Sequence, residues 1–390
     1  MINKFNPEKV KNLRVINQML RVVFHEKKST QKPDITKADN ILIIDPTLIG
    51  DIVMLIPALR ILRKNNENCK ITLACAKWAK NVLEDQNLVD EFIFVDPDFI
   101  NSVKKLAINR KELKEHLKRI NVREYDYAIE PRGDLRYIFF MHYCNAKRKI
   151  SYNYTGGECF LTDVIKPSDD VTHLVEDKLY FISSLGCDYD KLTDVYPRLV
   201  LSEQQRNKRE LFIKENSLEG KTIIGIHPGA SLDKKQWDGF SRLPGLLSDY
   251  NKDIVYVIFK GPKEDKAVAS VEEAAKANNA NYIISETSLN DYLIRISACS
   301  VMICNDSGAG HLAAAYGVTP FVIFGPFYPE LVKPYSKENA YCFSETIDCK
   351  PCMSKTCERN KECLELITAD KVAESIKNYF KENRSEEQKK

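Results

Sequence analysis

The sequence predicts an α/β protein made of two doubly wound, Rossmann-like halves that face a cleft. Three observations support this fold class. The chain has 390 residues, which is too long for one ordinary hydrophobic core. Short apolar runs alternate with helical patterns, which is typical of a parallel sheet covered on both faces. Finally, the alternation occurs in two series, separated near residue 200.

The predicted strands of the first series are residues 41–44, 71–74, 92–95 and 127–129. Those of the second series are residues 222–226, 254–259, 282–284, 301–304 and 321–324. We therefore expect a basic N-terminal extension at residues 1–39, domains at residues 40–200 and 201–380, and a charged tail at residues 381–390. A last helix is expected at residues 369–380.

The N-terminal extension contains apolar residues at helical spacing among basic ones. The apolar set is Leu13, Ile16, Leu20, Val23 and Phe24. The pattern favours a helix packed on the first domain, and a helix lying on a membrane surface is the alternative.

The composition excludes some classes of function. The 58 basic and 55 acidic residues leave a net charge of +3, so no strong field would attract nucleic acid. Hydrophobic residues make up 44% and charged residues 29%, as in a soluble globular protein. The sequence has no apolar run of membrane-spanning length and no signal-peptide pattern, so we expect a cytoplasmic protein.

Ten of the twelve cysteines fall into two kinds. Scattered cysteines in apolar segments are expected to pack as small reduced hydrophobes; they are Cys69, Cys75, Cys144, Cys187, Cys299 and Cys304. The Cys-rich loop at residues 349–363 has the spacing C-x2-C-x4-C-x5-C, which can bring four thiolates around one metal. Structural zinc, reduced unliganded thiols and an iron–sulfur cluster are the three alternatives for Cys349, Cys352, Cys357 and Cys363.

Residues 300–317 point to phosphate binding. An apolar strand ends there at Asp306, and Ser307, Gly308 and Gly310 then open a helix. The free N–H groups and positive dipole end of a helix start attract anions, and small residues let a ligand approach the backbone. With the strand that follows, this segment forms a βαβ unit whose ligand site is at the carboxyl end of the first strand.

Asp51 occupies the corresponding place in the first half. It follows the Ile49-Gly50 turn after strand 41–44 and stands at a predicted helix start. The helix dipole favours its ionised form, as a general base requires, whereas the pattern alone favours a simple N-cap. Pro57 falls inside the helical pattern and predicts a late start or a bend.

Three motifs, within residues 41–60, 226–237 and 300–317, resemble in order and spacing those of glycosyltransferase family 9. This family contains the bacterial ADP-heptose:lipopolysaccharide heptosyltransferases, and the resemblance covers roughly residues 40–375. It implies the glycosyltransferase B architecture, with the acceptor bound mainly by the N-terminal half and the nucleotide sugar mainly by the C-terminal half.

The resemblance also implies roles for single residues. Asp51 matches the catalytic aspartate. Lys235, in Lys-x-Trp, would stabilise the leaving diphosphate together with Ser231, although the sequence does not exclude Lys234. The donor would also contact Asp306, Ser307, Gly308 and His311, and Glu264 would bind the ribose. For His311 the alternative is an internal hydrogen-bonding residue, and for Glu264 an ordinary turn.

Arg132 and Arg136 follow strand 127–129 and are candidates for contacts to an acidic acceptor, with plain surface charge as the equal alternative. The resulting hypothesis is an inverting transferase that requires no metal cofactor. It would move a sugar, expected to be heptose, from a nucleotide diphosphate donor to a lipid-linked or glycan acceptor at the inner membrane surface. The alternatives are a nucleotide-sugar epimerase or hydrolase on the same fold and a non-catalytic module that binds a metal or a partner.

Overall fold

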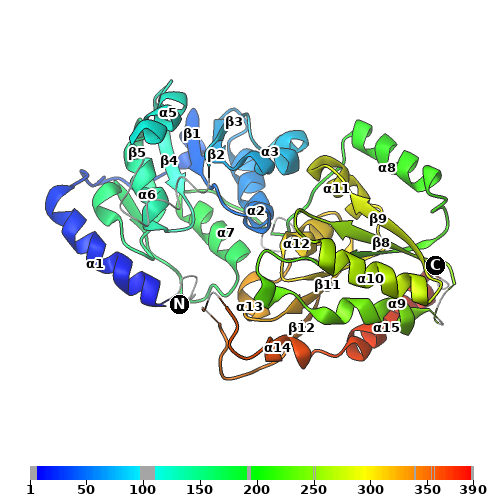
Figure 1. Cartoon of the computed structure of the whole chain (residues 1–390). Coiled ribbons are helices and arrows are strands. Elements are labelled where there is room, and N and C mark those ends of the chain that lie inside the picture. Colours follow the sequence, from blue (N-terminus) through cyan, green and yellow to red (C-terminus); the bar gives the residue numbers. More distant parts are fainter. Residues whose placement is uncertain are drawn as a thin grey trace. The chain divides into compact units, whose positions relative to one another are not determined.

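The computed structural model describes residues 7–96, 110–190, 195–248, 250, 252–337, 340–352, 354 and 356–387. The ends of the predicted N-terminal extension and tail, residues 1–6 and 388–390, lie outside them. The chain divides into two compact units, unit 1 (Met1–Pro197) and unit 2 (Arg198–Lys390). Figure 1 shows a sheet flanked by helices in each unit.

Unit 1 contains a six-stranded sheet in the order β3-β2-β1-β4-β5-β6, and every neighbouring pair is parallel. The first three strands add to the sheet in one direction, from β1 to β3. β4 then pairs with the other side of β1, so the direction in which strands are added reverses between β1 and β4. The strands are β1 (Asn40–Ile44), β2 (Lys70–Cys75), β3 (Glu91–Phe94), β4 (Tyr125–Glu130), β5 (Ala146–Tyr152) and β6 (Asp163–Ile165). The helices are α1 (Pro7–Val23), α2 (Ile49–Asn65), α3 (Lys77–Leu83), α5 (Arg110–Ile120), α6 (Leu135–His142) and α7 (Leu174–Ser184).

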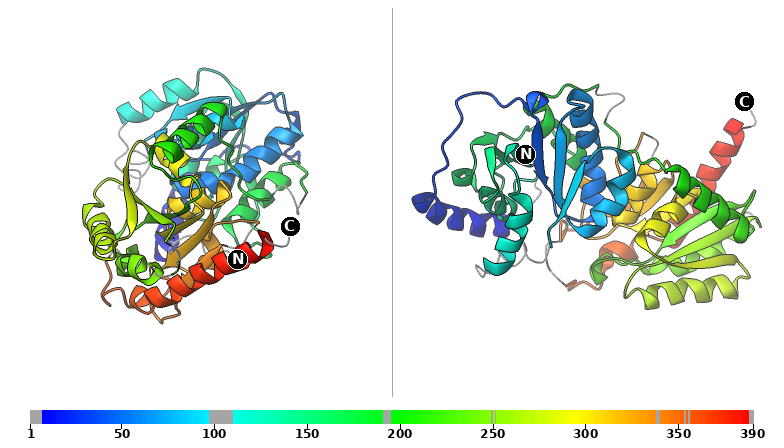
Figure 2. Two further views of the ribbon diagram at one scale, coloured as in Figure 1. Left: turned by 90° about the vertical axis from the view of Figure 1, so that its right-hand side faces the viewer. Right: turned by 90° about the horizontal axis from the view of Figure 1, so that it is seen from above.

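Unit 2 repeats this topology with the order β12-β11-β10-β7-β8-β9, again all parallel, and reverses between β7 and β10. Its strands are β7 (Thr222–His227), β8 (Ile254–Lys260), β9 (Asn281–Glu286), β10 (Val301–Asn305), β11 (Thr319–Phe324) and β12 (Tyr341–Ser344). Its helices are α8 (Glu203–Glu215), α9 (Leu243–Leu247), α10 (Asp265–Ala277), α11 (Leu289–Ile296), α12 (Gly308–Ala315), α13 (Pro329–Val332), α14 (Glu362–Glu365) and α15 (Ala369–Glu387). Two further views are given in Figure 2.

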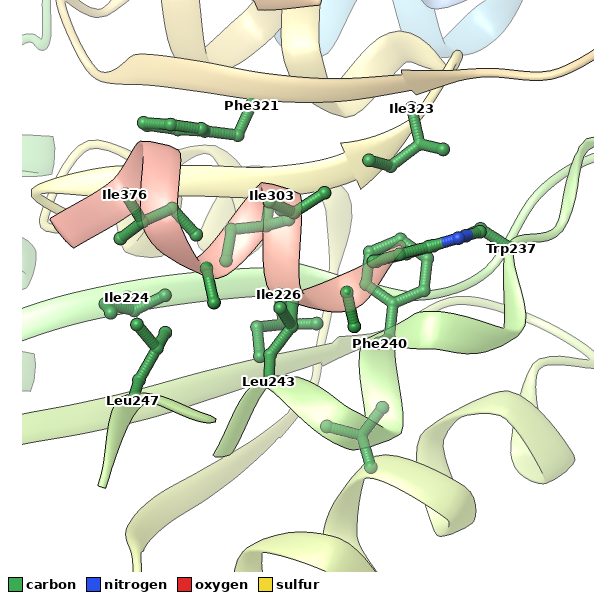
Figure 3. Close-up of a cluster of buried hydrophobic side chains, with 14 of the residues drawn as sticks. Ile224, Ile226, Trp237, Phe240, Leu243, Leu247, Ile303, Phe321, Ile323 and Ile376 are labelled. Atoms are coloured by element: carbon green, nitrogen blue, oxygen red, sulfur yellow. The ribbon is translucent and has the colours of Figure 1, made fainter. Parts of the chain in front are cut away.

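Apolar side chains from the central strands of unit 2 form its core with the last helix. Ile224 and Ile226 of β7 and Ile303 of β10 lie beside Ile376 of α15, as Figure 3 shows. Each of these four side chains is fully buried. The predicted strands of both series and the doubly wound fold class are therefore confirmed.

Three of the strands, namely β5, β6 and β12, were not predicted from the sequence. β6 and β12 are short edge strands, and only the last four residues of β5 are buried, so none forms a long apolar run. α2 begins at Ile49 and continues through Pro57, so the late start is wrong, while a bend at Pro57 stays a prediction. The last helix is longer than expected. α15 extends to Glu387, because the charged residues after Phe380 are good helix formers with no glycine or proline among them.

α1 packs against unit 1, which confirms the favoured expectation for the N-terminal extension. Leu13 is buried in the unit 1 core, and Ile16, Leu20 and Phe24 pack against it. Asn17 accepts a hydrogen bond from Gly157 N and donates one to Glu158. Within the part of the chain that the structure describes, no helix has the length and apolar character needed to cross a membrane.

Candidate active site

Each unit places charged side chains where its strand order reverses. In open parallel sheets this is where ligands bind, because the loops at the carboxyl ends of the two strands diverge there. In unit 1 these loops follow β1 and β4, and in unit 2 they follow β7 and β10. Each unit is described separately below.

In unit 1 the reversal point holds an ion pair between Asp51 and Arg132. Arg132 Nη1 lies 3.0 Å from Asp51 Oδ2, and the two side chains are 30% and 13% exposed. Burial acts to lower the pKa of Arg132, but the negative charge of Asp51 and further groups outweighs it and raises this pKa. Asp51 lies in the first turn of α2, whose N-cap is Leu48, so the N-cap alternative for Asp51 is wrong.

Buried Glu130 holds the loop that carries Arg132. Its carboxylate accepts hydrogen bonds from Gly133 N at 2.6 Å, from Ser151 Oγ at 2.7 Å and from Arg132 N at 3.2 Å. Burial raises the pKa of Glu130 to about 7. Gly133 has a φ of 75°, and a Cβ there would lie 2.8 Å from Tyr152 Cβ, so glycine is required at this bend.

Arg136 is placed differently from Arg132. It is 7% exposed, and its Nε donates to Asp134 Oδ1 at 2.7 Å. Plain surface charge, one of its two expected roles, is therefore wrong for Arg136. An acceptor contact stays a prediction for both arginines, and Arg132 presents the more accessible guanidinium.

In unit 2 the reversal point holds the ion pair between Lys235 and Asp306. Lys235 Nζ lies 2.6 Å from Asp306 Oδ2. Buried Asn305, at the end of β10, fixes the loop after β7 that leads to Lys235. It accepts a hydrogen bond from Trp237 N and donates to the carbonyl oxygens of Pro228 and Gly229.

The adjacent residues Lys234 and Lys235 bind different partners. Buried Lys234 donates to the carbonyl oxygens of Cys352 at 2.9 Å and Ser354 at 2.5 Å, so it anchors the Cys-rich loop. Lys235 instead reaches Asp306, next to the start of α12. The structure therefore favours Lys235 over Lys234 as the cation of the site.

The start of α12 has the features of an anion site. Ser307 is its N-cap, but the Ser307 side chain makes no capping hydrogen bond. The buried Ser307 hydroxyl has no oxygen or nitrogen partner among the described residues. Gly308 begins the helix and His311 is buried within it, whereas Ser231 is exposed on the loop after β7. The N–H groups and a hydroxyl at a helix start can bind phosphate oxygens.

Glu264 belongs to a hydrogen-bonded chain that the sequence did not reveal. His227 Nε2 lies 3.4 Å from Glu264 Oε1, and Tyr292 Oη lies 2.8 Å from His227 Nδ1. Gly261 N donates to Glu264 Oε2 at 2.7 Å. Burial acts to raise the pKa of Glu264, but the hydrogen bonds that its carboxylate accepts from His227 and Gly261 N outweigh it and lower this pKa.

The tautomer of His227 follows from its two partners. Burial raises the pKa of Tyr292 well above its usual value, so this hydroxyl stays protonated and donates to His227 Nδ1. Nε2 then carries the ring hydrogen and donates to the Glu264 carboxylate. A Cβ on Gly229 would lie 1.9 Å from Glu264 Cδ, which explains the glycine after His227-Pro228. The only sequence signal for this hydrogen-bonded chain was the motif that contains His227.

The four cysteines of the Cys-rich loop line one small cavity with Lys234 and Lys350. Lys361 N donates to Cys357 Sγ at 3.2 Å. Among the described residues, no group of three or more His, Cys, Asp or Glu side chains is arranged to hold a metal ion. Zinc binding by the four thiols stays a prediction. The six scattered cysteines are buried and free, as expected.

The sequence profile of glycosyltransferase family 9 (heptosyltransferase) matches residues 113–362. Lipooligosaccharide heptosyltransferase 2 of Campylobacter jejuni strain 81116 is 26% identical over 340 residues, which are 85% of this chain and 96% of that protein. Lipopolysaccharide heptosyltransferase 2 of Escherichia coli K12 is 23% identical over 316 residues, covering 76% and 85%.

Two solved structures have the same fold. A family 9 glycosyltransferase of Veillonella parvula gives a TM-score of 0.73 at 20% identity, over 90% of this chain and 98% of that one. ADP-heptose LPS heptosyltransferase II of E. coli gives 0.67 at 21% identity, over 88% and 99%. The two Rossmann-like units have the fold of the glycosyltransferase B architecture. The chain belongs to glycosyltransferase family 9, the heptosyltransferase family.

Proposed function

We propose that this enzyme transfers heptose from ADP-heptose to a lipopolysaccharide-core or related glycan acceptor, with inversion at the anomeric carbon. The observation that carries the proposal is the Lys235–Asp306 pair beside the uncapped start of α12. It places a fixed ammonium next to the start of a helix that has no side-chain cap. The names of the relatives, which are heptosyltransferases of lipooligosaccharide or lipopolysaccharide, support the choice of sugar and acceptor.

Unit 2 supplies the donor side of the reaction. The ammonium of Lys235 and the start of α12 would hold the diphosphate and stabilise the negative charge that grows on it as the glycosidic bond breaks. Glu264, kept ionised and oriented by His227 and Gly261 N, would accept hydrogen bonds from the ribose hydroxyls. Asp306 would orient Lys235 and accept hydrogen bonds from hydroxyls of the sugar.

Unit 1 supplies the base. The Asp51 carboxylate would take the proton of the acceptor hydroxyl while the hydroxyl oxygen attacks the anomeric carbon on the face opposite the diphosphate. The nearby charge of Arg132 favours the ionised carboxylate and fixes its direction. Stabilisation of the charge on the leaving group is assigned to Lys235 and the start of α12, with no catalytic metal in the proposal.

A donor screen by isothermal titration calorimetry tests this assignment. ADP-heptose should bind, whereas the UDP-, GDP- and CMP-sugars should bind at least about tenfold more weakly, because the base contacts are selective. Transfer is then measured with a lipid A–core glycan. Release of free sugar at full rate without acceptor would indicate a hydrolase instead, and equal affinity for all four nucleotides would contradict the ADP donor.

A further inference from the structure

The surface of α1 that faces away from the core of unit 1 is unusually apolar. Eleven large hydrophobic side chains are exposed among the described residues, and four of them are on this helix. Val15, Met19, Val22 and Val23 are 49%, 68%, 80% and 72% exposed. The other seven are spread over the rest of the chain. Single exposed hydrophobic residues are ordinary, but a group within nine positions indicates a contact surface.

The helix geometry places three of these residues on one face. Val15, Met19 and Val22 have the spacing i, i+4, i+7, which aligns side chains along one side of an α-helix. The opposite side is already covered, since Leu13, Ile16 and Leu20 pack against the core of unit 1. In Figures 1 and 2, α1 lies along the outer edge of unit 1. The helix is thus held in place by one apolar stripe and presents a second one outward.

The charge of residues 10–24 indicates the chemistry of the partner. Residues 10–24 contain three basic residues, Lys11, Arg14 and Arg21, and no acidic one. All three are exposed. Arg21 Nη1 is 3.7 Å from Glu158 Oε1, and its side chain is still 58% exposed. The chain as a whole is almost balanced, with a net charge of +3 over 390 residues. The excess of positive charge beside the apolar stripe is therefore local.

We infer that Val15, Met19 and Val22, flanked by Lys11, Arg14 and Arg21, form a docking surface for an anionic lipid bilayer. A helix lying in the interface can bury its aliphatic side chains at the boundary of head groups and acyl chains while its basic residues meet the anionic head groups. This inference rests on α1 itself. It extends the proposed function by holding the enzyme on the surface that would carry a lipid-linked acceptor.

Vesicle binding of the full-length protein tests the inference, in the absence of donor and acceptor. The probe is vesicles of phosphatidylglycerol mixed with phosphatidylcholine, compared with phosphatidylcholine alone. We expect wild type to cosediment with the anionic vesicles, and to do so less as salt is raised. The triple variant Val15→Ser, Met19→Ser, Val22→Ser should bind at least about tenfold more weakly.

The matched control replaces three exposed hydrophobic residues elsewhere, Val122→Ser, Val200→Ser and Leu211→Ser, which are 64%, 64% and 53% exposed in wild type. This control should bind vesicles like wild type. Arg14→Glu should weaken binding to anionic vesicles. Circular dichroism and thermal unfolding check that all variants fold, which is expected because the replaced side chains are on the surface.

Three outcomes would overturn the inference. They are no binding of wild type to anionic vesicles, equal binding of the two triple variants, and a wild-type dimer in sedimentation equilibrium that the α1 variant abolishes, which would mark an interface between copies. Transfer to a deacylated, water-soluble acceptor is measured in parallel and should be the same in both triple variants. If wild type lacks that transfer, the proposed function fails while the vesicle result still stands.

Discussion

Lys235 of the loop after β7 and Asp306, directly after β10, form an ion pair of 2.6 Å across the strand-order reversal of unit 2. Asp51 and Arg132 form the equivalent pair, of 3.0 Å, across the reversal of unit 1. The positions of the two charges are exchanged between the units. In unit 2 the loop after β7 carries the cation, whereas in unit 1 the loop after β1 leads to the carboxylate. The exchange suits a reaction in which one unit stabilises an anion and the other accepts a proton.

Lys235→Ala should weaken ADP binding about tenfold and slow transfer by about 10²–10³, because the lost charge acts more strongly on the transition state than on the bound donor. Calorimetry with ADP and initial rates measure the two effects. Lys221→Ala is the matched control, since this lysine pairs with Asp253 at the opposite end of β7. Unchanged affinity and rate in Lys235→Ala would remove this residue from the site.

Asp51→Asn should slow transfer by about 10²–10⁴ and leave donor affinity nearly unchanged, because the amide cannot accept the proton. Rates with saturating acceptor and calorimetry with ADP-heptose provide the measurement. Asp163→Asn is the control, since it weakens another carboxylate–guanidinium pair of unit 1, with Arg148, outside the β1–β4 reversal. Near-wild-type turnover in Asp51→Asn would refute the assignment of the base.

His227→Ala should lower the affinity for ADP about tenfold, because Glu264 loses the hydrogen bond that orients it. The loss should nearly vanish for an ADP analogue without ribose hydroxyls, since Glu264 would then have nothing to bind. Tyr292→Phe should show a smaller effect of the same kind. Tyr256→Phe is its control, because the buried Tyr256 hydroxyl has no hydrogen-bond partner among the described residues. An equal loss for both nucleotides would indicate general destabilisation instead.

Glu130 should make stability depend on pH. Its pKa is about 7 in the folded protein because of burial, against an ordinary value of 4.5. Between these values the unfolded chain has released the proton and the folded chain has not. The free energy of unfolding should therefore fall as pH rises from about 4.5 to about 7, by up to about 3 kcal/mol from this group. Urea unfolding at several pH values should show a smaller fall for Glu130→Gln. Parallel curves for the two proteins would contradict the assignment.

The Cys-rich loop should bind about one zinc per chain if its four thiols act together. Elemental analysis of protein purified under reducing conditions without chelator is the measurement, with Cys357→Ser, Cys363→Ser as the variant that should lose the metal. Transfer should persist in chelator, because the proposed chemistry uses Asp51 and Lys235. Loss of turnover with intact circular dichroism, restored by one divalent ion, would show that catalysis needs a metal.

The sequence by itself determined the doubly wound α/β fold and the candidate loops. Central strands such as β7 and β10 are buried on both faces and thus appear as continuous apolar runs, while the polar residues after them mark the carboxyl ends of the strands. Edge strands β6 and β12 gave too little apolar signal. Their existence depends on pairing with β5 and β11, which no local pattern records.

Only the tertiary structure decided which side chains meet. The ion pair of Lys235 joins residues 71 positions apart, and the chain from Tyr292 through His227 to Glu264 joins three segments. The adjacent residues Lys234 and Lys235 look equivalent in sequence, yet one bonds the Cys-rich loop and the other bonds Asp306. Local sequence sets the direction of a strand or helix, whereas such contacts depend on how separate loops converge at one end of a sheet.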